Sequence, residues 1–300
     1  MIIERSQLEN LELLAKQVVE GFIIGLHKSP FHGFSVEFAE HRLYNNGDPL
    51  RHIDWRVYGR TDKMFVKRYE EETNLRCCLA IDTSSSMLFP KDGNKLNKLE
   101  FSCVAAASLM HLLKKQLDAV SLSLFDSEVR YLSPARSASS HHRLLMHKLE
   151  ETMKANEVNS TTNAANALHT IAEQMHKRSL VIVFSDMMDD VDHIEDLFLA
   201  LQHLKFNKHE VILFHTLDGE KELAFEFDNR PFEFVDMETG DKVRLQPQQV
   251  KDEYLARMEE FRHMVENRCH QYKIDYVQVD LSQPVEQVLN AFLLKRNKLL

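Results

Sequence analysis

The chain has 300 residues, of which 44% are hydrophobic and 28% charged, enough apolar material to bury one substantial core. Its formal net charge of -9 supplies no field that would draw the protein onto DNA, RNA or an anionic bilayer. We therefore expect no nucleic-acid partner.

Cysteine usage and the N-terminus indicate the compartment. Four cysteines occur, none of them in CxxC spacing: Cys77, Cys78, Cys103 and Cys269. They predict buried thiols in a reducing environment, because a chain of this size needs no disulfide staples. The apolar stretch 18–26 is about half a membrane span and contains Glu20, and Met1–Ser6 does not look like a signal peptide. We expect a cytoplasmic protein without a transmembrane segment.

The first 74 residues predict a helix followed by an irregular or β-rich module. Leu8 to Phe22 repeat apolar positions at helical spacing. His32 to Glu72 are polar, punctuated by glycine and rich in both charge signs. Since no linker or low-complexity segment follows, we expect residues 1–74 to pack against the rest of the chain.

From Leu75 onward, short apolar runs alternate with amphipathic stretches of helical length. The predicted strands are 75–82, 120–125, 180–185, 211–217 and 274–279, and the predicted helices lie near 99–117, 142–153, 164–176, 194–204, 249–272 and 285–295. This alternation predicts an α/β domain over 75–300, a doubly wound, mostly parallel sheet with helices on both faces. Between about 222 and 244, aromatic and charged residues alternate around ETGDK, which predicts an inserted β-hairpin.

Candidate metal ligands follow the first predicted strand. In RCCLAIDTSSSM the strand ends at Ile81, and Asp82, Ser84 and Ser86 form a DxSxS loop that we expect to face solvent. Open α/β sheets bind ligands at such carboxyl strand ends. Mg²⁺ takes oxygen ligands at ~2.0 to 2.1 Å, and one carboxylate with two hydroxyls supplies three of them. Taken alone, the loop is equally compatible with a turn and a helix N-cap.

Two later features favour the metal site. NSTTNAANAL, residues 159–168, brings Thr162 to the start of a predicted helix, and VIVFSDMMDD puts Asp186 directly after the next apolar strand. A hydroxyl and a second carboxylate are thereby predicted at comparable strand ends.

These motifs resemble the metal-ion-dependent adhesion site of von Willebrand factor A domains, which has DxSxS, a threonine before a helix and an aspartate closing a strand. The resemblance implies that Mg²⁺ or Mn²⁺ is held, directly or through water, by Asp82, Ser84, Ser86, Thr162 and Asp186. The sequence departs from the family pattern at Ser160 and Thr161, where glycines are frequent, and at Met187, where glycine commonly follows the aspartate. A site without its partner's carboxylate is expected to hold the cation weakly.

A second resemblance covers residues 33–72, GFSVEFAEHRLYNNGDPLRHIDWRVYGRTDKMFVKRYEEE. Its landmarks EF, RxYxxGD, RxIDW, RT and VKxxxEE are similar to the signature of a bacterial domain-of-unknown-function family found with MoxR-type AAA+ ATPases. The resemblance continues through the A domain to Tyr254, Phe261 and the final helix. It implies that the partner is a MoxR-type AAA+ ATPase or its client.

The charged residues of the module admit two interpretations. A charge network locking the module onto the sheet, with Trp55 as a core anchor, would use Arg42, Asp48, Arg51, Asp54, Arg60, Lys67 and Glu70. Alternatively, Arg51, Arg56 and Arg60 face a partner together with Trp55, because arginine and aromatic side chains are favoured at binding hot spots.

Catalytic motifs are scarce. The sequence contains no GxxxxGK[ST], GxSxG or HExxH, and we expect His141, His142 and His147 to be surface histidines rather than zinc ligands. An alternative hypothesis is a metal-dependent phosphoryl-transfer or hydrolytic enzyme that uses Asp82, although no general base is evident. We therefore expect a non-enzymatic, metal-dependent adaptor that works with a MoxR-type ATPase in assembly, maturation or remodelling of a client.

Overall fold

The structure is a computed structural model that describes residues 3, 5–27, 41–43, 55–61, 63–67, 75–91, 95–154, 164–188, 194–237 and 240–299. The chain divides into two compact units, of which one joins Met1–Gly25 to Leu75–Leu300 and the other is Leu26–Asn74. The N-terminal helix α1 (Leu11–His27) therefore groups largely with the α/β domain and not with the module. The packing of the module on that domain stays a prediction.

The smaller unit contains an antiparallel strand pair among its described residues. β1 (His41–Leu43) pairs with β2 (Phe65–Lys67), and the short helix α2 (Trp55–Thr61) lies between them in the chain. This pairing agrees with the β-rich character expected for the segment.

The larger unit is built on a six-stranded sheet in the order β10-β7-β6-β3-β4-β5. Its strands are β3 (Arg76–Asp82), β4 (Ala119–Phe125), β5 (Val129–Leu132), β6 (Leu180–Ser185), β7 (Glu210–Leu217) and β10 (Asp275–Asp280). All neighbouring pairs are parallel except β4 with β5, which is antiparallel. The predicted fold class is confirmed, with β5 as a strand that the sequence reading missed.

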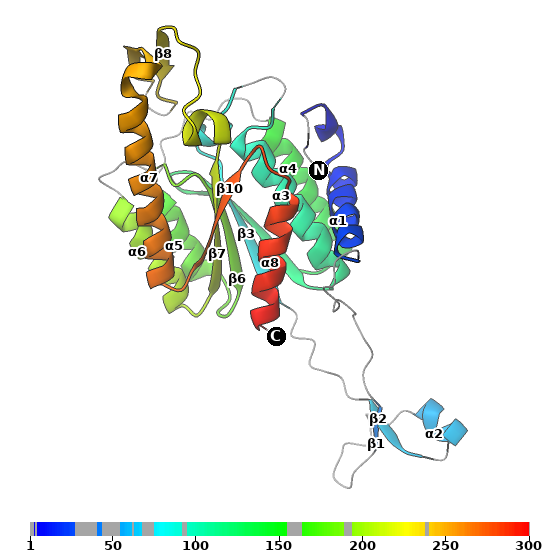
Figure 1. Ribbon diagram of the computed structural model, residues 1–300. Coiled ribbons are helices and arrows are strands. Elements are labelled where there is room, and N and C mark those ends of the chain that lie inside the picture. Colours follow the sequence, from blue (N-terminus) through cyan, green and yellow to red (C-terminus); the bar gives the residue numbers. More distant parts are fainter. Residues whose placement is uncertain are drawn as a thin grey trace. The chain divides into compact units, whose positions relative to one another are not determined.

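Helices cover both faces of the sheet (Figure 1). One layer contains α5 (Ala164–Gln174), α6 (Ile194–Phe206) and α7 (Pro247–Gln271), and the other contains α1, α3 (Lys98–Lys115), α4 (Ser139–Lys154) and α8 (Glu286–Leu299). Val181 and Val183 of β6 belong to the core on the α5–α6 side, and alternate residues of a strand point to opposite faces. Within the described part of the chain, no helix is long and apolar enough to cross a membrane.

β3 lies where the strand order reverses. After β3 the chain continues to β4 and β5 on one side, and then to β6, β7 and β10 on the other. Parallel pairing aligns Ile81 with Phe184, so the next residues, Asp82 and Ser185, come together at the carboxyl edge. Such a switch point is where open α/β sheets bind ligands.

The insertion after β7 differs in part from the hairpin expected near 222–244. β8 (Phe232–Val235) and β9 (Lys242–Leu245) form the antiparallel hairpin. Residues 223–227, LAFEF, are not a strand, because a π-helix (Gly219–Leu223) ends at the first of them and Phe225 takes a φ of 47°. Its aromatic residues build a cluster with the hairpin and α7 instead, made of Phe225, Phe227, Phe232, Phe234 and Tyr254.

A glycine allows the π-helix to begin close to β10. A Cβ added at Gly219 would lie 2.5 Å from Oδ2 of Asp280, which closes the last strand of the sheet. Any larger residue would require the Asp280 side chain or the π-helix to move. Gly219 therefore helps to set the position of Glu222 within that helix.

A capping box fixes the start of α3. The Asn97 side chain accepts a hydrogen bond from the Glu100 amide at 2.7 Å, and the Glu100 carboxylate accepts one from the Asn97 amide at 3.0 Å. Arg5 donates to the same carboxylate at 2.7 Å. This reciprocal bonding holds Lys98, the first residue of α3, at a defined position.

We expect Asn97→Ala to lower the free energy of unfolding by about 1 kcal/mol, because the Glu100 amide loses its acceptor. Urea unfolding followed by circular dichroism measures the change. Asn267→Ala, at an exposed position inside α7, is the control and should lose no stability, because alanine favours a helix interior by up to about 0.7 kcal/mol. Equal losses in the two variants would contradict the role given to the capping box.

Candidate functional site

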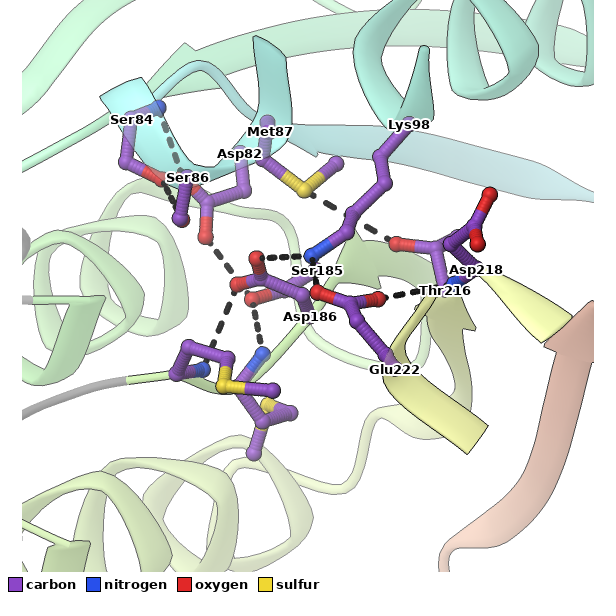
Figure 2. A network of polar contacts seen from close by, with 12 residues as sticks. Asp82, Ser84, Ser86, Met87, Lys98, Ser185, Asp186, Thr216, Asp218 and Glu222 are labelled. Carbon is purple, nitrogen blue, oxygen red and sulfur yellow. Dashed lines mark hydrogen bonds and ion pairs between the residues drawn. The ribbon is translucent and has the colours of Figure 1, made fainter. Parts of the chain in front are cut away.

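Two aspartates meet at the carboxyl edge of β3 and β6 (Figure 2). Asp82 is the last residue of β3 and is fully buried, and Asp186 directly follows β6 and is 1% exposed. The expectation that Asp82 lies in a solvent-facing loop is wrong. Pairing with β4 continues through Asp82, and both the amide and hydroxyl of Thr83 donate to the Phe125 carbonyl. This pairing draws the carboxylate into the domain.

The serines of the DxSxS loop turn their hydroxyls toward each other. Ser84 Oγ and Ser86 Oγ lie 3.1 Å apart, and the Ser84 amide donates to Asp82 Oδ1 at 2.9 Å. Ser84 is the N-cap residue of a 3-10 helix (Ser85–Leu88), yet its side chain makes no capping bond. The hydroxyl is therefore not used as an ordinary cap. Ser84 is buried and Ser86 half-buried, so solvent reaches the group from the Ser86 side.

Several predicted residues lie outside the described part of the chain. Thr162 is one of them, together with its neighbours Ser160 and Thr161. In the module, Arg51 and the side chains of Trp55 and Arg56 are likewise outside it, whereas Arg60 is exposed on α2. A metal-ligating role for Thr162 and a partner-binding role for the module both stay predictions.

A buried lysine that the sequence reading did not single out completes the cluster. Lys98 Nζ lies 2.8 Å from Asp186 Oδ2 and 2.5 Å from Glu222 Oε1, and its side chain is 1% exposed. The first turn of a helix disfavours positive charge, and lysine is rarely buried unless paired. The two carboxylates therefore make this position possible. A lysine directly after a capping asparagine was the signal that could have identified it.

The pKa values of the two aspartates are shifted in opposite directions. Burial, and then the negative charge of Asp186, raise the pKa of Asp82 to about 7, and hydrogen bonds from Ser84 and Ser185 offset only part of this. Burial also acts to raise the pKa of Asp186, but the Lys98 ammonium outweighs it and holds that pKa below its usual value. Lys98 thus compensates Asp186, and among the described residues no basic side chain is paired with Asp82.

Neighbouring side chains hold the two carboxylates in place. Ser185 Oγ donates to Asp82 Oδ2 at 2.7 Å and accepts from the Met187 amide at 3.0 Å. His215 Nε2 lies 2.9 Å from the Asp186 carbonyl, and its Nδ1 lies 2.8 Å from Tyr276 Oη. Burial lowers the pKa of His215 to about 4, so the ring is neutral at pH 7. Because a carbonyl only accepts, Nε2 carries the proton and Nδ1 accepts from the tyrosine.

Met187, at the position where the family pattern commonly has glycine, takes a backbone conformation that favours glycine. Its φ is 54°, in the left-handed region, which costs a residue other than glycine roughly 1 to 2 kcal/mol. Its side chain is 2% exposed and packs in the core on the α5–α6 side, which offsets that cost. The departure from glycine thus preserves the turn, and the Met188 amide still reaches Asp186 Oδ1 at 3.2 Å.

The donor set fits a hard divalent cation. Asp82, Ser84, Ser86 and Asp186 offer only oxygen atoms (Figure 2), as Mg²⁺ and Mn²⁺ prefer. No three His, Cys, Asp or Glu side chains of the described ranges gather as a metal site. Hydroxyl groups and water would therefore have to complete the coordination shell.

The predicted surface histidines are partly misassigned. His141 and His142 are buried on α4, and His141 Nε2 lies 3.1 Å from the Val120 carbonyl. His147 is exposed, 3.2 Å from Glu151. His141 faces β4, whereas His142 lies near Lys114 and His111 of α3, so both side chains are buried.

Comparison with known proteins yields one family. The model described as "Protein of unknown function DUF58" matches residues 40–264. The uncharacterized proteins Rv1480 of Mycobacterium tuberculosis and Mb1516 of Mycobacterium bovis are each 25% identical over 214 residues, 71% of this chain. The chain spans 65% of the length of these curated relatives.

Solved structures with a similar arrangement share little sequence with this chain. The conserved hypothetical protein BatB from Bacteroides thetaiotaomicron has 15% identity and a TM-score of 0.45, covering 75% of this chain and 99% of its own. The von Willebrand factor A domain of SpRpn10 has 12% identity and a TM-score of 0.39, covering 72% and 94%. The pilus adhesin SpaC from Lactobacillus rhamnosus GG has 12% identity and a TM-score of 0.48, covering 76% and 31%.

Asp82 should make the metal-free fold less stable as the pH rises. Its folded pKa of about 7 lies above its ordinary value of 3.8, so the folded state holds an extra proton between these values. The free energy of unfolding therefore falls as the pH rises through that window and levels off above it. Asp82→Asn imitates the protonated form.

In EDTA, the stability advantage of Asp82→Asn over wild type should grow across the window to roughly 1 to 3 kcal/mol. Urea unfolding in steps from about pH 5 to about pH 8 measures it. A difference that stays constant over this range would refute the raised pKa.

Proposed function

We propose that this chain, which belongs to the DUF58 family, is a protein–protein interaction adaptor that docks a partner through a divalent cation. The observation that carries the proposal is the meeting of the DxSxS loop with Asp186 at the switch point of the sheet. A cation held by Asp82, Ser84, Ser86 and Asp186 would keep a coordination position for a carboxylate of the partner. Thr162 is proposed as a further ligand.

The proposed partner is a MoxR-type AAA+ ATPase or its client. This choice is supported by the resemblance of residues 33–72 to a signature found with such ATPases. The adaptor would then act in assembly, maturation or remodelling of the client. We also propose a cytoplasmic location, with which the four buried thiols agree.

The insertion supplies a second surface beyond the carboxyl end of β7 (Figure 1). Val235 and Val243 on the hairpin are 49% and 56% exposed. Exposed apolar side chains suit a protein interface, because interfaces combine apolar contact with a polar rim. We propose the hairpin as a second contact surface for a partner.

We propose no catalytic role for Asp82. Both of its carboxylate oxygens accept hydrogen bonds, from the Ser84 amide and the Ser185 hydroxyl, which weakens the carboxylate as a nucleophile. The nearby His215 has both ring nitrogens engaged and would not serve as a base. Turnover of a phosphoester panel with Mg²⁺, lost in Asp82→Asn, would instead establish the alternative of a phosphoryl-transfer or hydrolytic enzyme.

We expect the purified protein to bind Mn²⁺ or Mg²⁺, and Asp82→Asn to weaken this binding at least about tenfold, because a ligand charge is lost. Isothermal titration calorimetry measures the affinities. Asp126→Asn is the matched control, since Asp126 is also buried just after a strand but is paired with Arg130 at 2.8 Å. The same affinity in wild type and Asp82→Asn would argue against the assigned site.

Asp82→Asn and excess EDTA should each reduce capture of the cognate ATPase. Loss of a buried charged contact costs ~2 to 5 kcal/mol, roughly 30-fold or more in affinity. A quantitative pull-down measures the loss, and circular dichroism should show an unchanged fold because asparagine has the shape of aspartate and its amide oxygen still accepts from the Ser84 amide. Undiminished capture under both treatments would show that the partner docks elsewhere. The next candidates would then be the module residues Arg51, Arg56, Arg60 and Trp55.

A further inference from the structure

One of the two proposed metal-binding carboxylates, Asp186, is already paired with the ammonium group of a lysine. Lys98 Nζ lies 2.8 Å from Asp186 Oδ2, and the lysine side chain is 1% exposed. The side chain is enclosed, and the capping box holds the backbone at the start of α3 from which it extends. Any divalent cation that uses Asp186 must share this carboxylate with the ammonium.

Sharing a carboxylate lowers the affinity for a second cation. Like charges a few ångströms apart repel strongly where water is excluded. Glu222 limits this effect, because its Oε1 holds the ammonium from the other side at 2.5 Å. Its second oxygen accepts from the Asp218 amide at 2.7 Å, which ties Glu222 to the end of β7. The ammonium of Lys98 therefore lies between the carboxylates of Asp186 and Glu222, the latter from the insertion (Figure 2).

We propose that Lys98 keeps the cation affinity of this site low, so that tight metal binding requires the acidic side chain that a partner brings. This inference rests on the proposed function and assigns the regulation of the same site. The ammonium of Lys98 offsets part of the negative charge with which Asp186 attracts the cation, and the partner's carboxylate replaces that charge. Because linkage is reciprocal, the metal and the partner then raise each other's affinity by the same factor.

The test is an Mn²⁺ titration of the full chain without partner, by calorimetry, comparing wild type with Lys98→Met. Methionine keeps a long, unbranched side chain and removes the charge. We expect Lys98→Met to bind Mn²⁺ at least tenfold more tightly. We also expect Mn²⁺ to raise its melting temperature more than that of wild type, since the ion then replaces the missing buried charge.

Two further variants separate competition from general disruption. Lys95→Met is the matched control, because Lys95 pairs with Glu220 of the same π-helix at 2.6 Å but is about half exposed; its Mn²⁺ affinity should stay within about twofold of wild type. Glu222→Gln should weaken Mn²⁺ binding, because the ammonium then rests on Asp186 alone. Charge competition predicts opposite shifts in Lys98→Met and Glu222→Gln, whereas general disruption would weaken Mn²⁺ binding in both variants.

Lys98→Met leaves two buried carboxylates without their ammonium, so the variant carries a risk of unfolding. The double variant Lys98→Met/Glu222→Gln removes one charge of each sign and should still bind Mn²⁺ more tightly than wild type. If wild type binds Mn²⁺ and the folded Lys98 variants bind it equally or more weakly, the proposal is overturned while the metal site stands. If none of them binds Mn²⁺, both are overturned.

Discussion

Two carboxylates buried side by side at one edge of the sheet impose the main constraint on this domain. Removing an ion from water costs several kcal/mol, so each buried charge needs partners within the protein. Lys98 supplies a positive charge to Asp186, while amides and a hydroxyl donate to both aspartates. A capping box holds Lys98, and a π-helix begun at Gly219 delivers Glu222 to it. Much of the irregular structure at this edge thus serves to keep charge buried.

The negative charges of the two aspartates are not neutralised equally, and this difference determines how the carboxyl edge of the sheet would bind a cation. Asp186 is ionised and matched by Lys98, whereas Asp82, with a pKa of about 7, is only weakly stabilised as an anion. A cation arriving from solvent would meet one carboxylate without a counterion and two hydroxyls, of which Ser86 is the accessible one. The arrangement favours an ion that carries its own ligands over one that is fully enclosed by protein.

The sequence predicted the sheet well because its strands are buried on both faces. Continuous apolar runs such as LVIVFS of β6 and amphipathic helices between them leave few alternatives. β5 was missed because four residues with weak alternation give little signal. The hairpin expected near 222–244 is shorter than that range, because Phe225 and Phe227 pack in an aromatic cluster with Phe234 and Tyr254 instead of extending a strand.

The candidate site was predictable only where strand ends themselves provide the residues. Asp82 and Asp186 follow directly from the strand pattern, but the burial of Asp82 depends on its pairing with β4, which no local pattern encodes. Lys98 meets its two carboxylates across 88 and 124 residues of sequence. Such long-range contacts become visible only when the topology is known.

The position of the site at the β3–β6 junction also determines when it can exist. β4, β5, α4 and α5 all lie between Asp82 and Asp186 in the chain, so a ribosome delivers the DxSxS loop long before its second carboxylate. Until β6 pairs with β3, the nascent chain holds one aspartate and two hydroxyls on a strand that has β4 as a neighbour but lacks the strand that precedes Asp186. Any activity that needs both carboxylates is therefore withheld from chains in which β6 has not yet joined the sheet.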